Sequence, residues 1–165
     1  MAITAYSAWW FLPLALPICL YVCFTDLSRM TITNRAVVAL FAVFVLLGPF
    51  ALPNWDVYFW RLAQLGIVLV LGVVLNAAGV MGAGDAKFAA AAAPFIALGD
   101  LRLLMALFAA ILLAAFVTHR IAKHSRLRAL APHWQSWSET KKFPMGLALG
   151  TTLATYLGLG CVFGA

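Results

Sequence analysis

Long apolar segments alternate with short polar connections along almost the whole chain. Six apolar segments can be delimited: Ala8–Phe24, Ala36–Leu52, Leu62–Ala78, Ala86–Leu98, Leu101–Thr118 and Phe143–Val162. A helix that crosses the hydrocarbon core of a bilayer takes about 20 largely apolar residues. The pattern therefore predicts an all-α integral membrane protein, built as a bundle of about six transmembrane helices.

Composition supports this fold class and bounds the rest of the chain. Of the 165 residues, 65% are hydrophobic and only 10% are charged, whereas soluble domains carry about 25% charged residues. The spans use most of the length, so we expect one transmembrane domain over residues 1–165. The first basic residue is Arg29, and the first span therefore lacks the basic flank of a cleaved signal peptide.

Basic residues are unevenly divided between the two sides of such a bundle. With alternating spans, one side receives all of the 11 Lys and Arg residues except Arg61 and Arg102. Because cytoplasmic loops are enriched in Lys and Arg, we expect this side to face the cytoplasm and both termini to lie outside. The net charge of +6 then reflects orientation in the lipid bilayer, and we expect no nucleic-acid partner.

A glycine-rich stretch, Gly79 to Lys87, precedes the fourth span and contains one acid, Asp85. Glycine allows backbone conformations and close approaches that other residues do not, and irregular backbone at membrane depth survives only where protein or a watery cavity surrounds it. An ionisable residue in such a place is a candidate for function. The alternative is that Asp85 simply caps the fourth helix, whose alanines predict close packing against other helices.

A second acid, Asp26, closes the first span on the same side as Asp85. One interpretation is an ion pair between Asp26 and Arg29 or Arg35. However, two carboxyls close together share a proton, so that the ionised one can activate water while the other donates to a carbonyl oxygen. This pairing predicts aspartic-peptidase chemistry. The sequence contains no C-x-x-C pair and no histidines at metal-binding spacing, so neither pattern points to a metal site. We expect no cofactor.

Three motifs resemble those of the type IV prepilin peptidases, membrane aspartic peptidases with a Gly-x-Gly-Asp motif. The run Gly82-Ala83-Gly84-Asp85-Ala86-Lys87 is similar to the family signature Gly-x-Gly-Asp-x-Lys. The segment from Asp26 to Asn34 is similar to the other acidic motif, with Thr33 where a proline is common. The run Phe143-Pro144-Met145-Gly146 resembles a proline and glycine pair before the last helix.

The resemblance implies that Asp26 and Asp85 are the catalytic pair and that Gly82 and Gly84 shape the active-site loop. The implied substrate is a pilin precursor in the cell inner membrane, cut on the cytoplasmic side after a short basic leader. The pilus assembly machinery is a further implied partner. Because the chain has no paired C-x-x-C motifs, it is similar to the compact, methyltransferase-lacking branch of tight-adherence (Flp-type) pilus systems.

Further polar residues of these motifs have more than one interpretation. Lys87 could contact the substrate or the aspartate pair, or simply flank the cytoplasmic end of a helix. Asn34 could form a local hydrogen bond with Asp26, since Asn favours such turn contacts, and Arg29 could contact the substrate or the pair. The basic segment 120–142 either borders the substrate groove along the inner interface or serves only as an orientation signal.

Other functions stay open on the sequence alone. An archaeal-type preflagellin peptidase would carry much the same two acidic motifs. A presenilin-like protease is disfavoured, because its Tyr-Asp pair does not occur in this chain. A non-enzymatic transporter or assembly component with a carboxylate pair would need more polar residues within its spans than the few that this chain offers.

Overall fold

Helices account for almost all of the chain that the structure describes. In the computed structural model, the described residues (1–125, 128–129, 131–139 and 143–165) form helices and turns, and no strand occurs in this part of the chain. The α-helices are α1 (Ala5–Arg29), α2 (Asn34–Ala51), α3 (Trp55–Ala77), α4 (Ala83–Ala92), α5 (Leu101–His124) and α6 (Met145–Phe163). Short 3-10 helices are η1 (Ala93–Phe95), η2 (Leu98–Asp100) and η4 (Gln135–Trp137).

Among the described residues, 5 helical stretches are long and apolar enough to cross a membrane: α1, α2, α3, the stretch from Leu98 through α5, and α6. The fourth apolar segment also forms a helix, but α4 has only 10 residues, about 15 Å at about 1.5 Å per residue. The α-helix gives way to η1 at Pro94, because proline lacks the N–H that an α-helix needs. The protein is thus an all-helical, multi-pass membrane protein, and α4 is its short helix.

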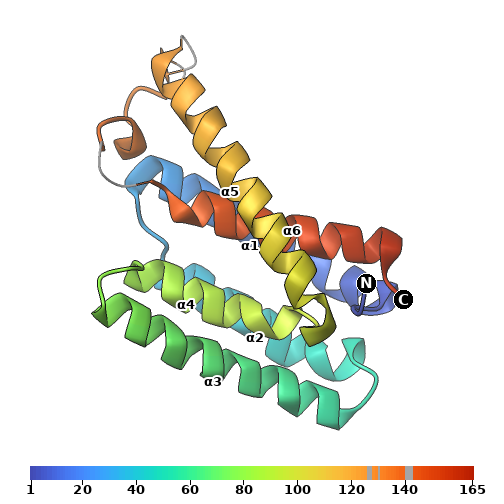
Figure 1. Ribbon diagram of the computed structural model, residues 1–165. Helices are drawn as coiled ribbons and strands as arrows, with labels where there is room; N and C mark the ends of the chain where they lie inside the picture. Colours follow the sequence, from blue (N-terminus) through green and yellow to red (C-terminus); the bar gives the residue numbers. More distant parts are fainter. Residues whose placement is uncertain (126–127, 130, 140–142) are drawn as a thin grey trace.

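The most extensive helix pair is α1 with α6 (Figure 1). Glycines on α6 permit this packing. A Cβ on Gly150 would lie 2.9 Å from the carbonyl oxygen of Cys19, and one on Gly160 would lie 3.0 Å from the Cβ of Ala8. Small residues at such positions let the backbones of membrane helices approach closely, so α1 and α6 form one tight unit.

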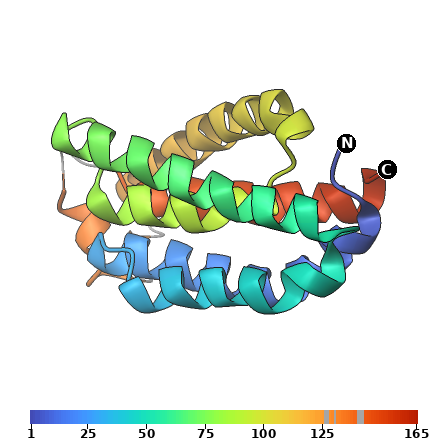
Figure 2. The same cartoon turned by 90° about the horizontal axis from the view of Figure 1, so that it is seen from below.

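The short helix α4 packs against α2, α3 and α6, and it runs beside α3 in both views (Figures 1 and 2). A Cβ on Gly72 of α3 would lie 2.9 Å from the Cβ of Ala86. Phe88, Ala90 and Ala91 are buried. The prediction that its small residues place this helix against protein is confirmed.

The polar connections gather at one end of the bundle. The ends of α1 and α3 and the starts of α2, α4 and α6 lie there, whereas both termini lie at the other end (Figures 1 and 2). This is the alternation of spans on which the charge count depends. It places Asp26 of α1 and Asp85 of α4 at the same end of the molecule.

A buried polar network holds the opposite end. Asp100 accepts hydrogen bonds from the N–H groups of Ala2 (2.6 Å) and Ile3 (2.9 Å) and from the hydroxyl of Tyr156 (2.9 Å). The same hydroxyl accepts a hydrogen bond from the N–H of Ala97 (3.0 Å). The sequence pattern assigns no role to Asp100 or Tyr156. In the fold they fasten the N-terminal residues and the turn before α5 to α6.

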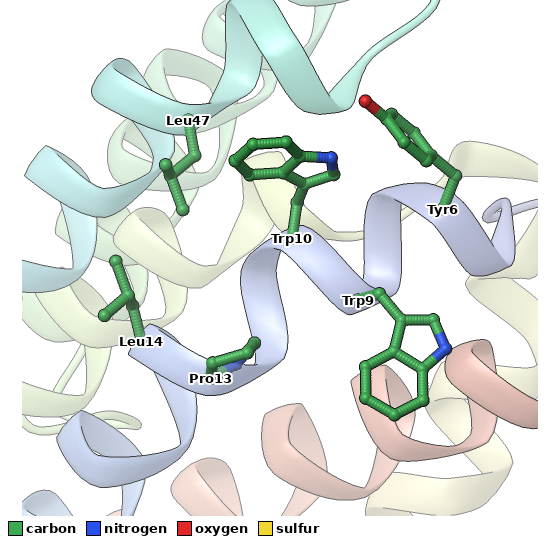
Figure 3. A pocket seen from close by; sticks show the side chains of 6 residues that line it. All are labelled: Tyr6, Trp9, Trp10, Pro13, Leu14 and Leu47. Atoms are coloured by element: carbon green, nitrogen blue, oxygen red, sulfur yellow. The ribbon is translucent and has the colours of Figure 1, made fainter.

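An apolar groove lies between α1 and α2 in the same half of the molecule (Figure 3). Its walls are Tyr6, Trp9, Trp10, Pro13 and Leu14 of α1 and Leu47 of α2. From Leu14 to Asp26 the helix rises by about 18 Å. Because the lining side chains are aromatic and aliphatic, the groove offers no acid or base for catalysis, and the candidate chemistry lies at the other end.

Candidate active site

Asp26 lies inside α1 rather than at its end. The sequence pattern predicts that Asp26 closes the first span, but the helix continues for a further three residues, to Arg29. The helix ends because Met30 adopts a left-handed conformation (φ 52°), and the N–H of Met30 donates to the carbonyl oxygen of Asp26 (2.9 Å). The side chain of Asp26 is therefore carried by a regular helix, and it is only 5% exposed.

The buried carboxylate of Asp26 is held by the start of α6. The backbone N–H of Gly146 donates to Oδ2 of Asp26 at 2.6 Å. The first N–H groups of any helix lack partners within the helix, and a buried carboxylate needs hydrogen bonds to offset its loss of water. Here the N–H at the start of α6 and the buried carboxylate of Asp26 supply each other's missing partner, although 120 residues separate them in the sequence.

No ion pair with a neighbouring arginine explains Asp26. Among the described residues, the side chain of Asp26 accepts a hydrogen bond from the N–H of Gly146 and forms no ion pair with Arg29 or Arg35. Arg29 is in the last turn of α1 and is exposed, where it complements the negative end of the helix dipole. The ion-pair alternative for Asp26 therefore has no support in the structure.

Asp85 lies in the first turn of α4. This helix begins at Ala83, whereas the sequence predicts a start at Ala86. The N-cap residue is Gly82, which forms no side-chain cap. The half-buried carboxylate of Asp85 lies beside Gly82, since a Cβ on Gly82 would be 2.7 Å from its Oδ2. The alternative that Asp85 caps the fourth helix as its N-cap residue is therefore wrong, because Asp85 lies inside the helix, at its third position.

The two glycines before Asp85 differ in what they do. A Cβ on Gly82 would lie 2.7 Å from Oδ2 of Asp85, so any other residue there would turn that carboxylate away from its present position. Gly84 belongs to α4, and a Cβ there would lie 3.3 Å from the Cβ of Ile32. The prediction that Gly84 belongs to an irregular loop is therefore wrong. The unusual backbone lies earlier, at Gly79 (φ 73°).

The two acidic motifs meet in space. Gly84 packs against Ile32 in the connection between α1 and α2, and Nζ of Lys87 donates to Oδ1 of Asn34 at 3.2 Å. Asp26 of α1 and Asp85 of α4 lie at the end of the bundle where these contacts form. The structure thus places the two acids that the sequence singles out at the same end, one on α1 and one on α4.

The polar partners of the pair differ from expectation. Asn34 does not bond to Asp26; its side-chain oxygen accepts from Lys87 instead. Both side chains are exposed, so this contact lies at the rim of the site. Thr33, where a proline is common in the resembling family, is the N-cap of α2, and its hydroxyl accepts from the N–H of Ala36 (3.3 Å). A proline there would supply no such cap.

Part of the basic segment 120–142 folds back over the same end of the bundle. Residues 126, 127, 130 and 140–142 lie outside the described ones, and with them part of the predicted interfacial segment. In the described part, η4 packs against α1. The ring of Trp134 meets that of Phe24 (6.1 Å between centroids), and the ring of Trp137 stacks on His119 (5.0 Å). The sequence shows the interleaved aromatic residues but not their partners.

The arrangement supplies two carboxyls and few other reactive groups. Within the described ranges, no group of three or more His, Cys, Asp or Glu side chains could hold a metal ion. Where two carboxyls lie close together, they favour a shared proton. Such a pair can act as base and acid on one water molecule and one carbonyl group.

Comparison with known proteins assigns the chain to a family. No curated protein and no solved structure matches it. A sequence model described as the type IV leader peptidase family matches residues 13–119. The matched region includes both acidic motifs and ends before Gly146 and α6. Since the match covers more than half of the 165 residues, the chain belongs to the type IV leader peptidase family.

Proposed function

We propose that the protein is a membrane aspartic endopeptidase that removes the leader of prepilin-like precursors, with Asp26 and Asp85 as its catalytic pair. The observation that carries this proposal is that both acids lie at one end of the bundle, where their two motifs contact each other: Gly84 packs against Ile32, and Lys87 is hydrogen-bonded to Asn34. Membership of a leader peptidase family supplies the reaction class.

In the proposed reaction the ionised carboxylate takes a proton from water, and the water oxygen attacks the scissile carbonyl carbon. The protonated carboxyl donates its proton to the carbonyl oxygen. When the tetrahedral intermediate collapses, the C–N bond breaks and a proton passes to the leaving amine. One water is consumed, one carboxyl and one amine terminus are formed, and the pair again holds one proton.

The proposed cleavage site faces the cytoplasm of an inner membrane. Counted along the sequence with alternating spans, the side that holds the two aspartates is assigned all of the 11 Lys and Arg residues except Arg61 and Arg102, and cytoplasmic loops are enriched in these residues. Asp26 is buried and Asp85 half-buried, so a precursor helix must unwind near its leader to present one extended peptide bond to both. Assembly of the product into a pilus would follow outside this site.

Co-expression with a candidate precursor tests the proposal. Asp26→Asn and Asp85→Asn each remove the acid–base function while keeping a similar shape, so leader cleavage should fall by at least about 10³-fold in each variant. The assay follows the size of the precursor on gels and the amount of the enzyme in the membrane fraction. A preflagellin-type precursor, run in parallel, tells which class of substrate is cut.

The matched control is Asp56→Asn. Asp56 is an exposed acid in the first turn of α3, at the far end of the molecule, and its loss should leave cleavage unchanged. Cleavage that survives either Asp26→Asn or Asp85→Asn, at normal membrane levels, contradicts the paired mechanism. Absence of cleavage by the unaltered enzyme on both precursors contradicts the proposed function itself.

A further inference from the structure

The start of α6 takes up one oxygen of Asp26. The N–H of Gly146 donates to Oδ2 at 2.6 Å in a buried place, whereas the N–H of Leu147 donates to the carbonyl oxygen of Pro144 (3.3 Å). A carboxylate held at one oxygen by backbone of another helix cannot rotate freely about its last torsion. Its second oxygen, Oδ1, is then the one left for water and for the proton shared with Asp85.

The contact also requires that residue 146 has no side chain. A Cβ there would lie 2.9 Å from both Cβ and Oδ2 of Asp26 and 3.0 Å from its Cγ. A contact between non-bonded heavy atoms below about 3.0 Å forces one of them to move, and a close-packed interior has few voids for it to move into. Any side chain at residue 146 would therefore push α6 away from Asp26 or turn the carboxylate.

Other glycines of α6 show that this contact is separate from helix packing. A Cβ on Gly150, one turn further, would meet the carbonyl oxygen of Cys19 and Sγ of Cys23, each at 2.9 Å, but not Asp26. A Cβ on Gly158 would meet nothing within 4 Å. Of the four glycines of α6, Gly146 thus lies against the carboxylate, Gly150 and Gly160 lie against α1, and Gly158 faces open space.

We propose that Gly146 is a positioning residue of the peptidase: its N–H fixes Oδ2 of Asp26 and thereby selects Oδ1 as the reacting oxygen. The inference rests on the proposed function of the Asp26–Asp85 pair and deepens it. It also extends the site beyond the region that the family comparison covers, which ends at residue 119. In these terms α6 is part of the catalytic apparatus as well as a packing partner of α1.

Three glycine-to-alanine variants of the full-length enzyme test the inference. Gly146→Ala should lower kcat at least about tenfold with KM little changed, because the carboxylate turns while the substrate contacts elsewhere persist. It should also alter the pH profile of kcat, since the environment of one titrating carboxyl changes. Gly158→Ala should match the unaltered enzyme. Gly150→Ala should reduce thermal stability in detergent but leave kcat of the folded fraction and its pH profile unchanged.

A second variant decides the matter if Gly146→Ala fails to accumulate. Pro144 is the N-cap residue of α6 and makes no side-chain cap. In Pro144→Ser the hydroxyl can accept from the N–H of the second or third helical residue, which competes with Asp26 while capping the helix. This variant should therefore accumulate and still lose kcat. Unchanged kcat and pH profile in Gly146→Ala, or in Pro144→Ser where Gly146→Ala is absent, overturn the inference.

Two further outcomes separate a specific role of Gly146 from helix packing and from the proposed function. If Gly150→Ala changes the pH profile as much as Gly146→Ala does, the effect belongs to α1–α6 packing, and the specific role of Gly146 is refuted. If the unaltered enzyme cleaves no precursor, the proposed function fails and the inference falls with it. Cleavage by the unaltered enzyme, together with normal kinetics of Gly146→Ala, refutes the inference alone.

Discussion

Replacing Tyr156 by Phe tests the polar network at the end of the bundle opposite the two aspartates. Tyr156 is fully buried, and Phe keeps its ring and nearly its volume, so packing is hardly changed. The substitution removes only the hydroxyl, which donates to Oδ2 of Asp100 (2.9 Å) and accepts from the N–H of Ala97 (3.0 Å). The N–H of Ala97 would be left buried and without its partner.

The size of the effect follows from these two lost hydrogen bonds. A buried amide left unpaired costs about 1–3 kcal/mol. The loss at Asp100 adds less, because this carboxylate keeps the N–H groups of Ala2 and Ile3. Hydrogen bonds between membrane helices average about 0.6 kcal/mol. We therefore expect the free energy of unfolding to fall by about 2 kcal/mol.

Reversible unfolding by SDS in mixed micelles measures this free energy. The matched control is Tyr21→Phe, since Tyr21 is 47% exposed on α1 and its change should cost less than about 0.5 kcal/mol. Leader cleavage under conditions where both variants are folded should equal that of the unaltered enzyme, because the aspartates lie at the other end. A Tyr156→Phe variant as stable as Tyr21→Phe would refute the reasoning about the buried Ala97 amide.

Two further predictions concern the rim of the site and the orientation of the bundle. Lys87→Met and Asn34→Ala each remove the 3.2 Å hydrogen bond between the motifs. Each variant should therefore lower kcat/KM by about 3–10-fold. The double variant should have the same kcat/KM as either single one, because both changes remove the same bond. Arg35→Met, at an exposed neighbouring cation, is the control; equal effects of Lys87→Met and Arg35→Met would contradict a role for the bond. Reporter fusions at Trp55 and Ser125 should report opposite sides of the membrane, and the same side for both would contradict the alternation of spans.

The helical fold follows from the sequence because it depends on simple lengths of apolar chain. Hydropathy is less informative where polar residues continue a helix. The helices α1 and α5 extend to Arg29 and His124, several residues beyond the apolar segments, because backbone hydrogen bonding continues there regardless of side-chain polarity. The fourth segment shows the opposite error: Pro94 lies within an apolar run but ends the α-helix.

The placement of the two aspartates at one end also follows from the sequence. This placement requires only that the spans alternate across the membrane. The count of Lys and Arg residues then predicts which side that end faces, and neither step depends on how the helices pack. What holds each carboxylate does depend on packing. The N–H that binds Asp26 comes from Gly146, 120 residues away, and nothing in the local sequence of either residue specifies that contact. The Lys87–Asn34 bond is of the same kind.

The two carboxyls are held by different parts of the bundle. Asp26 belongs to the tight α1–α6 unit and is fixed by backbone of α6. Asp85 belongs to α4, which packs on α3, and its carboxylate lies beside the N-cap residue of that helix, Gly82. The α1–α2 connection joins the two parts near the site, through Ile32 against Gly84 and through Asn34. Each of the three separated motifs therefore supplies either a carboxyl or the backbone that holds one, and none of them is sufficient alone.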